Sequence, residues 1–367
     1  MRFVALFVIP SFLFGAATGY AAVAVQDVTV VDVASGSLRP HMTAVIDGDK
    51  ISALGPMGAV ATPAGARLVK GTGKFLTPGL WDMQVHLGAS KNQLPAFLAF
   101  GVTGVRDRGG DFDRIANQRL AIARGSAVGP HIVTSGAPVG ELVAGTPQEA
   151  RVAFDRLFKQ DVDFIQILPD LSRDSYFALA EQARHWHLRL DGDIPTGVSA
   201  WDAVDARQGI IEDLSGLAAF VEESAVRFFQ RCAMMGTRIS PVLLPGRDAA
   251  RLSQLTALAK HEKVEILAGS GSANPYTKSA SLQDELSSLV AAGLAPREAL
   301  ESATLAPARL LGWDSVMGSV ERGKMADLVL LDGNPLEDIG NMGRISAVFA
   351  RGRYYSRSDL DAILAAQ

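Results

Sequence analysis

Residues 75–87, FLTPGLWDMQVHL, mark the point at which the pattern of this sequence changes. The preceding residues are rich in β-branched side chains and strand-like. From about residue 76, short apolar segments alternate with amphipathic helical stretches. This alternation is typical of repeated β–α–β units that build a parallel sheet. We therefore expect residues 79–85, inside the quoted stretch, to form the opening strand of such a sheet.

Seven further apolar segments have the length and composition of strands. They are residues 104–106, 131–135, 164–168, 188–191, 210–212, 238–242 and 265–268, and the helical stretches among them include 147–160, 173–186, 222–235 and 296–311. Together with residues 79–85 this gives the eight strands of a (β/α)8 barrel, which takes about 250 residues. The chain has 367 residues, enough for a barrel and a smaller companion domain. The predicted fold class is α/β, with a TIM-like barrel.

The two ends of the chain have a different, all-β pattern. Strand-like segments occur at residues 25–33, 44–51 and 66–70, and again at residues 326–331, 345–349 and 353–355. We expect the two sets to pair into one small β-sandwich beside the barrel. The predicted organisation is a signal peptide at 1–24, sandwich strands at 25–75, the barrel at 76–312, the remaining sandwich strands at 313–356 and a C-terminal tail at 357–367.

The first residues have the features of a secretory signal peptide. Arg2 is the only charged residue before Asp27, and residues 3–14 form an apolar run interrupted by a proline and a serine. Small residues then offer cleavage after Ala21 or after Ala24. The prediction is an exported protein, periplasmic or secreted, with no stable membrane span after cleavage. An uncleaved membrane anchor is the alternative.

Composition excludes several classes of protein. The hydrophobic fraction of 48% and the charged fraction of 20% fit an ordinary packed core. A net charge of −4 without a lysine- and arginine-rich run argues against a nucleic-acid partner. Cys232 is the only cysteine, so no intrachain disulfide can form, and its apolar helical surroundings predict a buried structural thiol.

Four segments together resemble the amidohydrolase superfamily, nearest its imidazolonepropionase-like and prolidase-like branch. They are FLTPGLWDMQVHL at 75–87, GVTGVRDRGG at 101–110, ATLAPAR at 303–309 and GSVERGKMADLV at 318–329. The resemblance implies a barrel with a small composite β domain. It also implies metal-assisted hydrolysis of carbon–nitrogen bonds, most often in cyclic amides or dipeptide-like substrates. In that chemistry one or two divalent ions lower the pKa of a bound water and polarise the scissile carbonyl.

The resemblance also implies a set of metal-site positions at the ends of the barrel strands. The family pattern is His-x-His on strand 1, Lys on strand 4, His on strands 5 and 6, and Asp on strand 8. His86 matches the second histidine, whereas the other five positions hold Gln84, Gln166, Asp193, Asp213 and Gly271 in that order. A glutamine amide is a poor zinc ligand, and glycine has no side chain to move a proton. The usual metal centre is therefore not expected.

The replacements leave an acidic site, for which three outcomes stay open. A divalent metal (Mg²⁺, Mn²⁺, Ca²⁺ or Zn²⁺) would be held by His86, Asp193 and Asp213. A cationic small molecule would bind the carboxylates. Alternatively, the carboxylates pair internally, for instance with Arg106. The remaining predicted pocket residues are Gln84, Gln166, Gly271, Asn274 and Tyr276.

Two functional hypotheses follow from this site. The favoured one is a pseudoenzyme or ligand-binding module, because ligands, lysine and acid are lost together. The alternative is an active hydrolase with a carboxylate-rich single-metal site, or with Asp193 and Asp213 as an acid–base pair. His185 and His187 form a His-x-His before strand 5, at the non-catalytic end of the barrel, and are expected to be structural. A homo-oligomer is compatible with the sequence.

Overall fold

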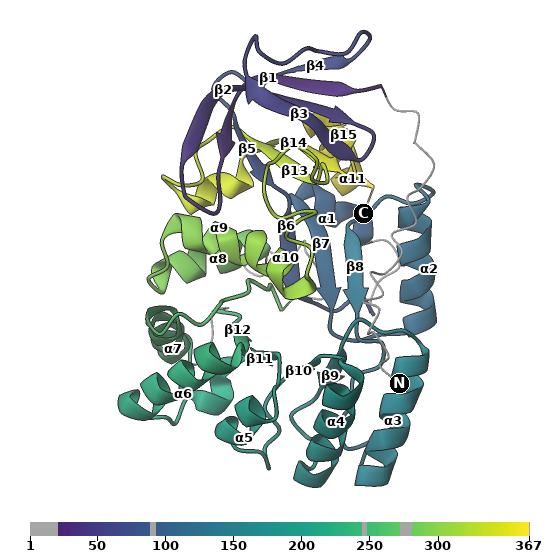
Figure 1. Ribbon diagram of the computed structural model, residues 1–367, viewed down its shortest axis with the longest axis vertical. Helices are drawn as coiled ribbons and strands as arrows, with labels where there is room; N and C mark the ends of the chain where they lie inside the picture. Colours follow the sequence, from purple (N-terminus) through teal and green to yellow (C-terminus); the bar gives the residue numbers. More distant parts are fainter. Residues whose placement is uncertain (1–20, 89–92, 244–247, 272–280, 367) are drawn as a thin grey trace, which may run out of the picture.

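Strands from both ends of the chain form one sheet of eight strands. The computed structural model describes residues 21–88, 93–243, 248–271 and 281–366. The sheet contains β1 (Val23–Val31), β2 (Leu38–Asp47), β3 (Lys50–Pro56), β4 (Arg67–Lys70), β5 (Phe75–Pro78), β13 (Leu328–Leu331), β14 (Ile345–Ala350) and β15 (Arg353–Ser356). Its order is β15-β14-β13-β5-β1-β2-β3, with β4 also paired to β1. The early and late strands meet where β5 pairs antiparallel with β13, as the adjoining purple-blue and yellow ribbons show (Figure 1).

A second, curled set of strands is parallel throughout. β6 (Leu80–Val85), β7 (Val102–Asp107) and β8 (His131–Thr134) form one arc; β9 (Ile165–Ile167), β10 (Leu190–Gly192), β11 (Ile210–Glu212) and β12 (Arg238–Ser240) form the other. Backbone hydrogen bonds connect the arcs. Asp163 N donates to Thr134 O at 2.9 Å, and Met83 N donates to Ala268 O at 3.0 Å. The carboxyl ends of these strands therefore converge on one region.

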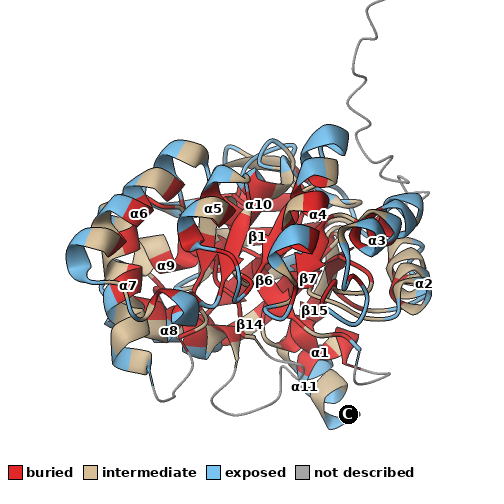
Figure 2. Cartoon of the chain, turned by 90° about the horizontal axis from the view of Figure 1, so that it is seen from below, coloured by how far each residue is buried: buried red, intermediate tan, exposed pale blue. Residues whose placement is uncertain are grey.

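Helices cover the outside of the curled sheet, with their buried faces turned inward (Figure 2). They are α1 (Leu94–Ala99), α2 (Phe112–Ala123), α3 (Pro147–Lys159), α4 (Arg173–Trp186), α5 (Ala200–Asp205), α6 (Glu222–Met235), α7 (Ala249–His261), α8 (Leu282–Ala291), α9 (Pro296–Ser302) and α10 (Leu305–Leu311), with 3-10 turns η1 (Leu214–Leu217) and η2 (Ile339–Gly343). The last helix, α11 (Arg357–Ala365), packs against α1 and against β14 and β15 of the eight-stranded sheet. Among the described residues, none of the helices has the length and apolar character needed to cross a bilayer.

The predicted α/β class is confirmed, with three local differences. Residues 296–311 form two helices, α9 and α10, where one was expected. Residues 265–268 contribute one isolated bridge, Ile239 to Ile266, in place of a full strand. The expected C-terminal tail contains α11, whose Leu360 is fully buried.

Candidate functional site

A buried arginine stands at the centre of the site. Arg106 on β7 is 0% exposed and pairs with two carboxylates that are equally buried, Asp191 at 2.9 Å and Glu212 at 2.5 Å. Its guanidinium also lies 3.7 Å from the centre of the Phe164 ring. Burial alone would raise the pKa of Glu212, but the positive charges of Arg106 and Arg108 outweigh it and hold that pKa below its usual value. Glu212 is therefore an ionised group inside the fold.

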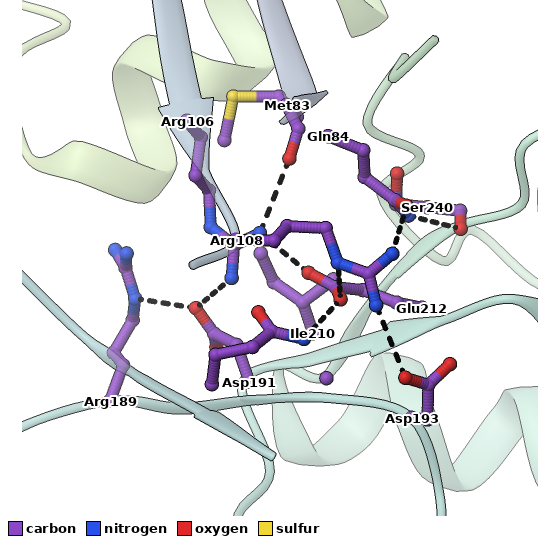
Figure 3. Close-up of polar contacts among 12 residues, drawn as sticks. Met83, Gln84, Arg106, Arg108, Arg189, Asp191, Asp193, Ile210, Glu212 and Ser240 are labelled. Atoms are coloured by element: carbon purple, nitrogen blue, oxygen red, sulfur yellow. Dashed lines mark hydrogen bonds and ion pairs between the residues drawn. The ribbon is translucent and has the colours of Figure 1, made fainter. Parts of the chain in front are cut away.

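A second arginine, Arg108, lies nearer the strand ends and contacts three other strands. Its Nε forms an ion pair with Glu212 Oε2 at 2.6 Å, and its Nη2 donates to Asp193 Oδ2 at 3.1 Å. Its Nη1 donates to Gln84 Oε1 at 3.0 Å. Figure 3 shows this guanidinium surrounded by Gln84, Glu212 and Asp193. Glu212 thus bridges two guanidinium groups, one through each carboxylate oxygen.

Two of the replaced metal positions carry glutamines that belong to the same network. Gln84 on β6 donates through Nε2 to Ser240 O at 3.1 Å while its Oε1 accepts from Arg108. Gln166 on β9 donates through Nε2 to Glu212 Oε2 at 2.7 Å. Both side chains are about 1% exposed. Gln84 therefore connects the two arcs of the curled sheet, whereas Gln166 connects β9 to β11 within one arc.

The predicted carboxylate pair does not lie as expected. Asp193 is partly buried and faces Arg108, whereas Asp213 is exposed and accepts a hydrogen bond from Ser215 N at 2.9 Å. Asp213 therefore does not join Asp193 in the predicted acidic site, because it is exposed and caps η1. Burial first, then the charges of Glu212 and Asp213, raise the pKa of Asp193 to about 6 against the opposing effect of Arg108.

The other predicted site residues are placed as follows. His86 follows β6 and is partly buried; burial and the charge of Arg108 lower its pKa. Gly271 has a φ of +63°, and a Cβ there would lie 2.8 Å from Val242 Cγ1. An aspartate at this position would therefore adopt a strained φ and would require the Val242 side chain to shift. Asn274 and Tyr276 lie outside the described residues.

The residues present do not fit a divalent metal ion while Arg108 keeps this position. Within the described ranges, no group of three or more His, Cys, Asp or Glu side chains is arranged to hold a metal. The inward carboxylates, Asp193 and Glu212, already neutralise guanidinium groups. A metal would need the same oxygen lone pairs and would be repelled by the adjacent arginine charge.

The remaining histidines have structural partners or positions. His131 lies 2.9 Å from Asp327 and stacks on Trp81, and His41 and His261 pair with nearby acids. His187 ends α4 in the left-handed conformation, next to His185 and at the amino-terminal side of β10. These positions agree with the structural interpretation of the His-x-His pair.

Sequence reasoning missed the two residues that define the site, Arg108 and Glu212. A weak signal was present for each. Arg106 and Arg108 are two residues apart at the end of one strand, so they share a face. Glu212 directly precedes Asp213, the position on which the family pattern focuses attention. Neither signal predicts that the Arg108 and Glu212 side chains are in contact, because that contact depends on the curling of the sheet.

Comparisons with known proteins agree with this fold. The model of the Amidohydrolase family matches residues 253–354. A solved putative prolidase from Bifidobacterium longum is 25% identical, with a TM-score of 0.79 over 94% of this chain and 98% of that one. Molinate hydrolase has a TM-score of 0.80 at 18% identity over 93% of this chain and 96% of that one, which is a likeness of fold.

A curated relative matches a short stretch only. It is a putative N-acetylgalactosamine-6-phosphate deacetylase from Escherichia coli (strain K12), 43% identical over 56 residues. The match covers 15% of this chain and about a third, 34%, of that protein's length. The family match, the fold and the solved neighbours agree with the resemblance read from the sequence motifs. The family model over residues 253–354, together with the solved putative prolidase at 25% identity, supports assignment of the chain to the amidohydrolase superfamily.

Proposed function

We propose that this protein is a catalytically degenerate amidohydrolase, a barrel that binds a small molecule without the metal-assisted hydrolysis of its relatives. The observation that carries the proposal is the position of Arg108. Its guanidinium pairs with the carboxylates and the amide oxygen at the strand ends. A metal-bound water needs free anionic or imidazole ligands, and a proton shuttle has no side chain at Gly271. The prolidase neighbours make dipeptide-like or cyclic amides the first ligands to examine.

Two measurements on the same protein test this proposal. The purified chain is incubated with Xaa-Pro dipeptides and with cyclic amides, with and without Zn²⁺ or Mn²⁺, and amine release is followed. We expect no metal-dependent hydrolysis. The same compounds are screened by thermal shift, and a concentration-dependent rise in Tm identifies a ligand. Metal-dependent turnover that is abolished in Asp193→Asn would contradict the proposal.

The alternative is an active hydrolase that uses carboxylates for proton transfer. The observation in its favour is Asp193, whose side chain is 21% exposed and whose pKa is raised to about 6, close to the range in which a general base works. This alternative predicts hydrolysis that needs no added metal. The rate should rise with pH as Asp193 ionises near pH 6 and should be lost in Asp193→Asn.

We also propose that the protein is exported. The support is the amino-terminal pattern, with Arg2 ahead of an apolar run and small residues at the cleavage positions. The test is the cellular fraction in which the full-length gene product accumulates, with an Arg2→Glu variant as the matched control. Recovery of unprocessed wild-type protein in the cytoplasm would reject export.

A further inference from the structure

The geometry points to Arg108 as a built-in cation that stands in for a metal ion at the barrel mouth. This inference rests on the proposed function and adds to it the group that replaces the metal. The three contacts of the guanidinium come from three different strand ends: Gln84 on β6, Asp193 after β10, and Glu212 on β11. A positive group held by oxygen atoms from several strands has the arrangement of a coordinated cation.

The ion-paired groups of the network carry equal positive and negative charge only when Arg108 is present. Three arginines, Arg106, Arg108 and Arg189, face three carboxylates, Asp191, Asp193 and Glu212. Asp107 accepts hydrogen bonds from Leu87 N and Thr134 Oγ1, and Asp213 accepts one from Ser215 N. These donors are neutral, so both carboxylates add negative charge beside the ion-paired set. Replacing Arg108 by a neutral residue leaves an excess of negative charge next to Glu212, which is fully buried. A cation is then the group that relieves this excess at least cost.

Removing the guanidinium would also free donor atoms that suit a hard divalent cation. Gln84 Oε1, Asp193 Oδ2 and Glu212 Oε2 would each lose the Arg108 contact. All three are oxygen atoms, which are the ligands of Mg²⁺, Mn²⁺ and Ca²⁺. We therefore expect the neutral variant to acquire a site for such an ion. The wild-type protein should not have this site.

The test is Mn²⁺ binding by the full chain. Binding is measured by calorimetry and by the loss of the electron paramagnetic resonance signal of free Mn²⁺. Arg108→Ala is expected to bind about one Mn²⁺ per chain through these oxygens. At roughly 100 times the dissociation constant, Mn²⁺ should raise its Tm by about 5 °C. Wild type and Arg108→Lys, which keep the positive charge, should show neither effect. The double variant Arg108→Ala/Asp193→Asn should lose the binding.

The remaining results either overturn the inference or support it through refolding. A folded Arg108→Ala protein that does not bind Mn²⁺ would show that the guanidinium does not occupy a cation site. If Arg108→Ala does not fold, Arg108→Met keeps more of the side-chain volume, and both variants are refolded with Mn²⁺. Recovery of the native circular dichroism supports the inference, and no recovery in either variant rejects it. Stoichiometric binding by wild type, lost in Asp193→Asn, rejects it directly.

The outcome is separable from that of the proposed function. Metal-independent hydrolysis by wild type would overturn the proposed function and leave the role of Arg108 intact. Failure of Arg108→Ala to gain Mn²⁺ binding would overturn the role of Arg108 and leave the absence of hydrolysis standing.

Discussion

At the scale of single residues, the fold depends on how Glu212 is compensated. Its carboxylate is fully buried, and such a group is tolerated only when opposite charges and hydrogen bonds replace the lost water. Arg106 supplies one charge and Arg108 the other, while Gln166 donates a hydrogen bond to the Glu212 oxygen that forms the ion pair with Arg108. The guanidinium fork suits this geometry better than an ammonium group, because it donates in several fixed directions.

Arg106→Met should therefore be strongly destabilising. It leaves Asp191 and Glu212 buried without their main counter-charge, and breaking one side of a buried pair costs about 3–5 kcal/mol. The free energy of unfolding is measured by urea titration. The matched control is Arg227→Met, whose ion pair with Glu223 is exposed and should contribute at most about 0.5 kcal/mol. Equal losses in the two variants would contradict the importance assigned to the buried network.

Glu285 on α8 should make stability depend on pH. Burial raises its pKa from 4.5 to about 8, against the opposing effect of its hydrogen bond from Leu243 N. Because the folded pKa exceeds the unfolded one, the folded chain holds a proton that the unfolded chain has released. The contribution of Glu285 to the free energy of unfolding is therefore fully present below pH 4.5 and is lost as the pH rises toward 8.

Glu285→Gln keeps a neutral carbonyl acceptor and removes the titration. We expect the two proteins to unfold at similar urea concentrations near pH 4.5, and the variant to be more stable by a few kcal/mol, as an order of magnitude, near pH 8. The measurement is a urea titration at each pH. A difference that does not change with pH would show that the carboxyl group does not stay protonated in the folded chain.

At the scale of elements, the pairing of β6 with β7 depends on a glycine. A Cβ added to Gly104 would lie 2.1 Å from the Trp81 ring, which is 2% exposed and also contacts Trp313. The absence of a side chain on β7 therefore lets the indole pack across the neighbouring strand. This contact belongs to the layer of the core below the arginine network.

Gly104→Ala should destabilise the protein by about 1–3 kcal/mol through overpacking. Gly216→Ala is the matched control, because a Cβ there meets nothing within 4 Å. Thermal unfolding of the two variants gives the comparison. A neutral Gly104→Ala would mean that the Trp81 ring moves aside at little cost.

Local sequence patterns predict most helices and strands. They do not predict the positions at which tertiary contacts interrupt these elements. The stretch 296–311 has a continuous helical pattern, yet the helix breaks near Ala303. The Ser302 and Ala303 carbonyls accept hydrogen bonds from Ala268 N at 3.0 Å and Trp81 N at 2.7 Å. These carbonyls therefore bond the curled sheet, which nothing in the local sequence specifies.

The same limit applies to the site. Family positions directed attention to Gln84, Gln166 and Asp193, because motif spacing places residues at strand ends. The partner of Asp193 was sought in Arg106, whereas the structure pairs it with Arg108. Which of the two neighbouring arginines pairs with Asp193 depends on how deeply each side chain lies in the curled sheet. That depth is set when the two arcs assemble.

At the scale of the whole molecule, the first strand bears on processing of the amino terminus. Val23 and Ala24 belong to β1 and are buried, pairing with Ile46 and Val45 of β2. Cleavage after Ala24 would remove both residues from the large sheet. Cleavage after Ala21 would leave β1 complete.

We therefore predict that the exported chain begins at Ala22. Intact-mass measurement of protein from the exported fraction decides between the two positions. The matched control is a variant in which Ala21 is replaced by a large residue, Ala21→Phe, which should block cleavage there. A mature chain that begins at Val25 would contradict the prediction, and an uncleaved chain would favour the membrane-anchor alternative.

The whole account depends on whether the arginine network has replaced the metal centre. The most direct measurement is the metal content of wild-type protein, by plasma mass spectrometry after incubation with Zn²⁺ or Mn²⁺ and gel filtration, beside Asp193→Asn. The account predicts far less than one ion per chain in both proteins. About one ion per chain in wild type, lost in Asp193→Asn, would contradict it, since Asp193 would then be a metal ligand and not the partner of Arg108.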